Sequence, residues 1–124
     1  MLYVVISRFD EAAVARLRGD LPPAAFAYID EAIHHQRVPS QADIEAQGVP
    51  TSLASVLAAH LAHLTGLRGS GKLVSGGPCT GFVNAINIFE AGSADEARTL
   101  HDADPLAQHG FFAVETVYPW QRVF

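Results

Sequence analysis

The start of the chain alternates in the manner of a β-strand. Leu2, Val4 and Ile6 fall on one face, Tyr3 and Val5 fall on the other, and both faces are apolar. A strand with one face in water shows polar residues on that face. The pattern therefore predicts a central strand that is covered on both sides.

Two helices are predicted after this strand. Asp10 is a suitable N-cap for a short helix that Gly19 ends. Pro22 restarts the chain, and a second helix is indicated by apolar residues at helical spacing: Phe26, Ile29 and Ile33. The polar stretch 39–50 then connects this helical region to the next element.

The strongest helical pattern lies in the middle of the chain. It begins at Thr51 or Ser52, either of which can cap it, and ends near Gly66. One stripe of its surface is formed by residues spaced by four, three, four and three: Leu53, Leu57, His60, Leu64 and Leu67. His60 therefore lies in the middle of an apolar helix face.

The last third of the chain reads as strand, strand, helix, turn and strand. Strands are predicted at 72–76 and 82–91 from their β-branched and aromatic residues. The run Ser93-Ala94-Asp95-Glu96 matches a capping box and predicts the start of a helix. Asp104-Pro105 begins a turn, because proline fixes φ and has no amide donor, and the final strand covers 111–120.

This order predicts one domain over residues 1–124 with the α+β ferredoxin-like plan β-α-β-β-α-β, a four-stranded antiparallel sheet with helices on one face. The helical material of residues 10–50 is an insertion after the first strand. We expect the other face of the sheet to carry apolar residues: Phe82, Ile86, Phe112, Val114 and Trp120. Such a face predicts a homodimer that packs sheet against sheet.

Charge and cysteine content narrow the function classes. The chain has 8 Lys and Arg residues against 13 Asp and Glu residues, a formal net charge of −5, so we expect no nucleic-acid partner. Cys79 is the single cysteine, which excludes an internal disulfide and fits a cytoplasmic protein. The first apolar run is too short for a signal sequence or a membrane span, and we expect no membrane partner.

Several segments carry a family resemblance. The runs Ala103-Asp104-Pro105-Leu106, Gly110-Phe111-Phe112 and Val117-Tyr118-Pro119-Trp120 resemble the C-terminal signature of the YCII-related family. His60-Leu61-Ala62-His63-Leu64 is similar to that family's His-Leu-x-x-Leu helix, and residues 71–78 look like its strand and Gly-Pro turn. The insertion at residues 10–50 has no counterpart in the compact members of the family.

The resemblance implies a dimeric α+β barrel that needs no cofactor, with His60 and Asp104 as an active-site pair. It also implies small ring compounds as substrates. Relatives and similar folds dehydrochlorinate chlorinated hydroxyquinols or isomerise muconolactones.

The chemistry of these two residue types agrees with that implication. A histidine, with an ordinary pKa of about 6.5, can accept a proton near neutral pH. A carboxylate on its other ring nitrogen fixes the tautomer and stabilises the imidazolium that forms. The alternative interpretation is that His60 is a packed core histidine and that Asp104 only caps the turn before Pro105.

Five further residues are candidates for substrate binding. Ser75 ends a predicted strand beside a glycine-rich loop and could orient a substrate oxygen; the alternative is a turn residue that bonds its own backbone. His63 follows His60 by three positions and borders the same face or is a half-exposed helix residue. The inserted helices are either simple packing or a wall of the pocket, with Tyr28, His34 and Arg37 at the ligand.

No cofactor or metal site is predicted. The six histidines and Cys79 lack the tight spacing of a structural zinc site. The run Gly66–Lys72 fits the spacing of a phosphate-binding loop, but Leu73 stands where Ser or Thr is required, and helix precedes strand. We reject that motif.

The sequence therefore predicts a cofactor-independent enzyme, a lyase or isomerase that uses His60 and Asp104 for proton transfer. The reaction we expect is elimination or isomerisation on a small ring, lactone or quinol of aromatic catabolism or secondary metabolism. Two alternatives stay open: a non-catalytic dimeric binding module, and a cofactor-free monooxygenase of the same barrel architecture.

Overall fold

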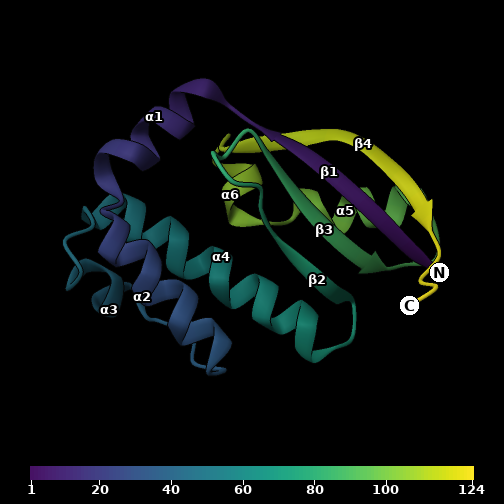
Figure 1. Cartoon of the computed structure of the whole chain (residues 1–124), viewed down its shortest axis with the longest axis horizontal. Coiled ribbons are helices and arrows are strands. Elements are labelled where there is room, and N and C mark those ends of the chain that lie inside the picture. The colour runs from purple at the N-terminus through teal and green to yellow at the C-terminus, as the bar shows by residue number, and fades with distance from the viewer.

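The computed structural model describes all 124 residues, as a four-stranded antiparallel sheet with helices on one face and a helical lobe beside it (Figure 1). The strands are β1 (Leu2–Phe9), β2 (Leu73–Pro78), β3 (Asn84–Glu90) and β4 (Phe112–Trp120). The helices are α1 (Glu11–Asp20), α2 (Pro23–His34), α3 (Gln41–Glu45), α4 (Thr51–Gly69), α5 (Ala94–Asp102) and α6 (Pro105–Gln108). None of these helices combines the length and apolarity needed to cross a membrane.

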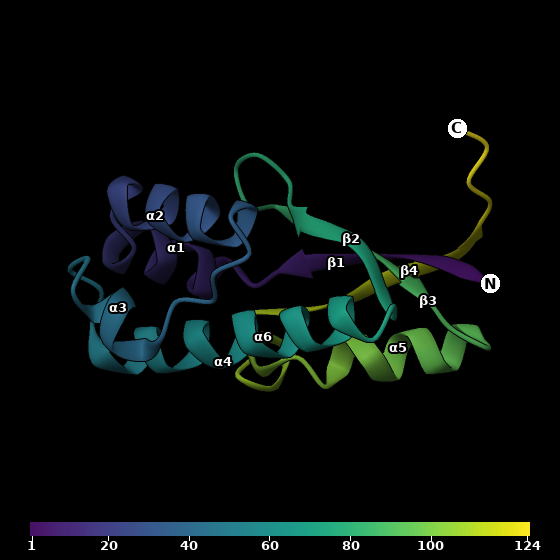
Figure 2. The same cartoon turned by 90° about the horizontal axis from the view of Figure 1, so that it is seen from below.

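The sheet has the strand order β2-β3-β1-β4, with β1 pairing antiparallel to both β3 and β4. This order is that of the ferredoxin-like plan, and the predicted fold class is confirmed. The inserted helices α1, α2 and α3 lie between β1 and α4 in the chain. Figure 2 shows α4 and α5 on one side of the sheet, with α2 standing across from α4 beyond the β2 edge.

One face of β1 is buried under the helices. Tyr3, Val5, Ser7 and Phe9 are each at most 8% exposed, whereas Leu2, Val4 and Ile6 on the other face are only partly buried. The helices of this chain therefore cover β1 on one side only. The prediction of a strand covered on both sides is not met within a single chain.

The composition of the open face differs from the prediction. Phe112 aligns with Phe9, and Val114 aligns with Ser7, so both point to the helices, and Phe112 is buried. Phe82 precedes β3 at a φ of 56° and packs edge-on against Phe9, so it also belongs to the core. Placing these three residues on the open face was wrong.

The open face is nevertheless apolar. Ile86 and Trp120, which were predicted there, are 40% and 39% exposed. They align with Ile6 and Leu2 respectively, and Tyr118 aligns with Val4 on the same face.

The observed ends of the helices match the predicted ends only in part. Asp10 caps α1 by accepting from the Ala13 amide, as predicted, but α1 runs through Gly19 to Asp20. For α4 the predicted Thr51 or Ser52 cap is wrong: Pro50 is the N-cap residue, no side chain caps the helix, and the helix extends to Gly69. Proline suits this start because the first amides of a helix lack partners in any case.

Two short helices complete the fold. α3 begins at a capping box in which the Ser40 amide and hydroxyl bond Asp43, and these bonds hold the pKa of the Asp43 carboxyl below its ordinary value. The predicted turn at Asp104-Pro105 is a single helical turn, α6, with Asp104 as its N-cap.

Candidate active site

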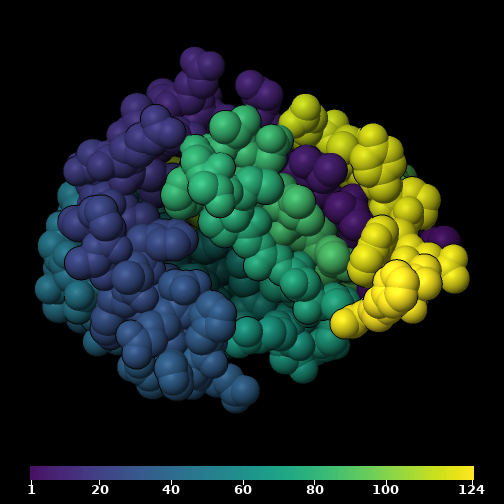
Figure 3. All heavy atoms as spheres, in the orientation of Figure 1, coloured from purple at the N-terminus to yellow at the C-terminus, as the bar shows by residue number.

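A largely apolar cavity of about 230 Å³ lies between the helical lobe and the sheet. Figure 3 shows the hollow between α2 and the β2 region, with α4 at its floor. Its helical walls come from α1, α2, α4 and α6, and its sheet side comes from all four strands. The predicted stripe of α2 takes part: Phe26, Ile29 and Ile33 all line the cavity.

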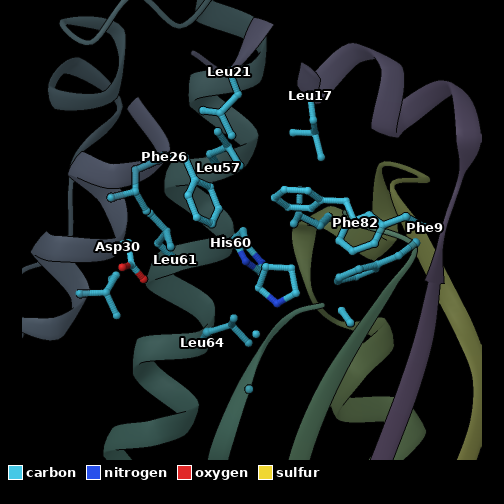
Figure 4. A pocket seen from close by; sticks show the side chains of 18 of the residues that line it. Phe9, Leu17, Leu21, Phe26, Asp30, Leu57, His60, Leu61, Leu64 and Phe82 are labelled. Carbon is cyan, nitrogen blue, oxygen red and sulfur yellow. The ribbon is translucent and has the colours of Figure 1, made fainter. Parts of the chain in front are cut away.

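Aromatic rings close one end of the cavity. The ring of Phe82 meets Phe9 and Phe26 edge-on, at centroid distances of 5.6 and 5.7 Å. Figure 4 shows His60 projecting from α4 into the space between Phe26 on one side and Phe82 and Phe9 on the other. A planar ring that enters the cavity would meet aromatic and aliphatic surfaces around this histidine.

His60 and Asp104 form a hydrogen-bonded pair. The Nδ1 atom of His60 lies 2.8 Å from both carboxylate oxygens of Asp104. The Asp104 side chain is 2% exposed and the His60 side chain is 17% exposed. A buried carboxylate beside Nδ1 makes that nitrogen the N–H donor, so Nε2 is the unprotonated nitrogen in the neutral ring.

Both partners are held by their local structure. Asp104 Oδ1 also accepts the Leu106 amide at 2.9 Å, and the Asp104 amide donates to the His101 carbonyl at 3.0 Å. The carboxylate is therefore fixed between α5 and α6. His60 lies on the α4 stripe between Leu57 and Leu64, which also line the cavity, so the helix presents the imidazole to that space.

The structure does not bring the other predicted binding residues to the cavity wall. Ser75 is exposed on the β2 edge strand and aligns with Ile88. Ile88 in turn aligns with Val4, which lies on the open face. Tyr28, His34 and Arg37 belong to α2 and the loop after it but are not lining residues. His63 is half-buried on α4, and its Nε2 atom is sealed from solvent without a partner.

Two polar lining residues were missed by the sequence interpretation. Asp30 follows Ile29 on α2 and lies at the cavity, where its carboxylate is 3.5 Å from His34 Nδ1. Asn87 lies in the middle of β3 and is 5% exposed. The alternation of β3 was a usable signal, because Asn87 shares the inward face with the apolar Ala85 and Phe89.

The cavity has a defined electrostatic character. Its ionisable lining groups are His60 and Asp30, and no lysine or arginine lines it. The structure also contains no cluster of three or more His, Cys, Asp or Glu side chains that could hold a metal ion. The arrangement provides one imidazole with a fixed tautomer in apolar surroundings, which is suited to moving a proton on a bound molecule.

Comparison with known proteins agrees with this architecture. The proteins named YciI from Escherichia coli and Shigella flexneri are each 34% identical to this chain, over 56% of this chain and 82% of their own length.

A solved structure shares the fold. It is 5-chloro-2-hydroxyhydroquinone dehydrochlorinase (TftG) from Burkholderia phenoliruptrix, in complex with 2,5-dihydroxybenzoquinone. It matches with a TM-score of 0.57 and 21% identity, over 98% of this chain and 94% of that one. The family model of the YCII-related domain matches residues 1–121, and this chain therefore belongs to the YCII-related family.

Proposed function

We propose that this protein is a cofactor-independent enzyme that moves a proton on a small ring compound, with His60 as the general base and acid. The observation that carries the proposal is the His60–Asp104 pair. Nδ1 is occupied by a buried carboxylate at 2.8 Å, and the imidazole lies at the wall of an apolar cavity. A histidine that served only in packing would not need an open space on one side.

The reaction class that fits best is elimination or tautomerisation next to a carbonyl. His60 Nε2 takes a proton from carbon, the C–H electron pair forms a C=C bond, and the carbonyl electron pair moves onto oxygen. Return of that pair either expels a leaving group such as chloride or allows reprotonation at another carbon. Asp104 stabilises the imidazolium that exists between the two steps. The neighbouring dehydrochlorinase fold, which binds a quinone, supports the elimination form.

The size and charge of the cavity favour an uncharged monocyclic substrate. An apolar cavity of about 150 Å³ is enough for benzene, so about 230 Å³ suits one ring with a few substituents. A carboxylated lactone would enter a cavity that has no cationic lysine or arginine and has Asp30 at its wall. Desolvating an unpaired carboxylate is costly, and we therefore favour quinols and related neutral rings over lactone acids.

The test is His60→Ala assayed for chloride release from chlorinated hydroxyquinols and for solvent-deuterium exchange into neutral cyclic ketones. We expect a loss of activity of about 10²- to 10⁴-fold, the usual contribution of general acid–base catalysis. Far-UV circular dichroism should stay unchanged, because the ring lies at a cavity. The control is His35→Ala, which changes an exposed histidine bonded to the Glu31 carbonyl and should keep full activity. Full activity of His60→Ala would refute the proposal.

A ligand-binding module is the second candidate, and the apolar cavity is what favours it. In that case ring compounds would bind equally to wild type and to His60→Ala, and no turnover would depend on pH near neutrality. Oxygen consumption during turnover would indicate the monooxygenase reaction instead.

We further propose that two chains associate through the open faces of their sheets. Ile86, Tyr118 and Trp120 are 40%, 57% and 39% exposed on that face. Monomeric proteins seldom leave a contiguous apolar sheet face in water. Because the cavity lies on the helical side of the sheet, this mode of association leaves it accessible.

A further inference from the structure

The side-chain amide of Asn87 lines the cavity and has no part in the proton transfer proposed above. Asn87 occupies the inward face of β3, where it aligns with Val5 on one neighbouring strand and with Gly76 on the other. Its surroundings on that face are apolar, and the residue is 5% exposed. A buried amide ordinarily satisfies its hydrogen bonds inside the protein, because an unpaired one costs stability.

Asn87 does not satisfy the hydrogen bonds of its side-chain amide inside the protein. Asn84, three residues earlier on β3, donates to the Ser7 carbonyl and to the Glu115 carboxylate. The Asn87 side chain has no such partner within the chain. Two side-chain polar atoms are both sealed from solvent and without a partner, His63 Nε2 and His101 Nε2, and the amide atoms of Asn87 are not among them. Since Asn87 lines the cavity, its open hydrogen-bonding capacity faces that space.

The neighbouring strand is shaped to hold this amide. A Cβ atom on Gly76 would lie 2.1 Å from Asn87 Oδ1 and 3.1 Å from Cγ. Only glycine therefore leaves room for the amide to lie against β2. With Oδ1 directed toward Gly76, the Nδ2 group points away from that strand and is the atom left to donate. Gly77, the next residue, would have nothing within 4 Å of an added Cβ, so the requirement is specific to position 76.

We propose that Asn87, seated over Gly76, is the substrate-orienting donor of this site, and that Nδ2 binds a carbonyl or hydroxyl oxygen of a neutral ring. This inference rests on the proposed function and deepens it by naming the polar anchor of the substrate. When His60 removes the carbon-bound proton, negative charge develops on the carbonyl oxygen. A donor already placed at that oxygen lowers the barrier without reorganisation.

The proposal also defines the substrate class more closely. The ring must carry an oxygen that can accept from Asn87, and it must be uncharged to enter the apolar cavity. Hydroquinone and p-xylene are a matched pair of probes, because they share a shape and differ only by two hydroxyls in place of two methyls. The ratio of their affinities isolates the polar contact, since any change of cavity volume affects both.

The experiment measures the dissociation constants of both probes by calorimetry or ligand-observed NMR. The affinity of hydroquinone relative to p-xylene should be about three- to tenfold lower in Asn87→Ala than in wild type, the range of one neutral hydrogen bond. Gly76→Ala should reduce it similarly by displacing the amide, whereas Gly77→Ala should leave it unchanged. In the Asn87→Ala background, Gly76→Ala should have no further effect.

The outcomes separate this inference from the proposed function. If the affinity of hydroquinone relative to p-xylene is the same in wild type and Asn87→Ala, or if Gly76→Ala and Gly77→Ala change it alike, the orienting role of Asn87 is overturned even where His60 is essential for turnover. If this relative affinity depends on Asn87 and on Gly76 but no activity depends on His60, the orienting role of Asn87 is supported and the proton-transfer function is refuted.

Discussion

At the scale of single residues, Asp104 has two tasks that use the same carboxylate. Its Oδ1 accepts the Leu106 amide and so caps α6, and both oxygens lie 2.8 Å from His60 Nδ1. The two interpretations that the sequence left open, a turn cap or a partner of His60, are therefore not exclusive. The cap fixes the carboxylate that in turn fixes the imidazole.

Asp104→Asn separates these tasks. The Asn side-chain oxygen can still accept the Leu106 amide, so the free energy of unfolding should change little. The carboxylate that selects the Nδ1–H tautomer is lost, and the imidazolium is no longer stabilised. We expect the proton-transfer rate to fall about 10²- to 10⁴-fold, measured as kcat, with thermal denaturation reporting stability.

A matched control is Asp10→Asn, which makes the same change at the N-cap of α1, where the side chain accepts from the Ala13 amide. This variant should keep its rate. Equal rates for Asp104→Asn and wild type would contradict the coupling between the cap and the base.

At the scale of helices and strands, α2 supplies one wall of the cavity. Phe26, Ile29 and Ile33 line the cavity, and Figure 4 shows Phe26 across the space that His60 enters. The side chains predicted to reach a ligand from this region, those of Tyr28, His34 and Arg37, are not in the wall. The apolar stripe, and not the polar residues beside it, is what contacts the cavity.

Phe26→Ala tests that wall. Phe26 is 40% exposed and meets Phe82 edge-on, so its truncation should cost little stability but remove one aromatic contact with a bound ring. We expect KM to rise about two- to tenfold, in line with the worth of one aromatic contact, with kcat less affected. Tyr28→Ala, on the same helix but outside the wall, is the control and should leave KM unchanged. The reverse result would mean that the predicted polar residues bind the ligand after all.

The elements also show which features the sequence could predict. The His60 stripe and the caps at Asp10 and Ser93 depend on neighbours within a few positions, and the structure has them. The capping box predicted at Ser93 forms in part, because the Glu96 carboxylate accepts from the Gly92 amide and not from the Ser93 amide. The inward direction of Phe112 and Val114 depends on how β4 aligns with β1, where a register shift occurs between Ile6 and Ser7. A displacement of one residue moves a side chain to the other face, and no local pattern specifies it.

The cavity could not be predicted from the sequence, because it also depends on how distant segments pack. Its wall joins residues of the insertion to residues of β3 that lie more than fifty positions away, such as Ile29 and Asn87. A polar residue in the middle of an apolar strand was visible in the sequence. That its amide would face a cavity and not a partner could be known only from the packing of β2 and α4 around it.

At the scale of the whole molecule, the two faces of the sheet have different roles. The helical face bears the cavity, and the open face carries Ile86, Tyr118 and Trp120. We expect the open faces of two chains to pack together, since this face is apolar and the edges of the cavity do not involve it.

Ile86→Glu should break this association, because a carboxylate at the centre of an apolar interface would be buried without a partner. Sedimentation velocity at micromolar concentration should show a dimer for wild type and a monomer for the variant. Val38→Glu is the control, since Val38 is 41% exposed and Ile86 is 40% exposed, but Val38 lies in the loop after α2. A monomeric wild-type protein would exclude the dimer.

The placement of the insertion has a consequence for how such a protein can diversify. The proton-transfer pair is formed by α4 and by the turn between α5 and α6, whereas much of the wall opposite it comes from residues 11–34. A change of sequence or length between β1 and α4 can therefore reshape the binding site while the base and its partner keep their geometry. Laboratory evolution toward new ring substrates should accumulate its substitutions in that segment first, leaving residues 60 and 104 unchanged.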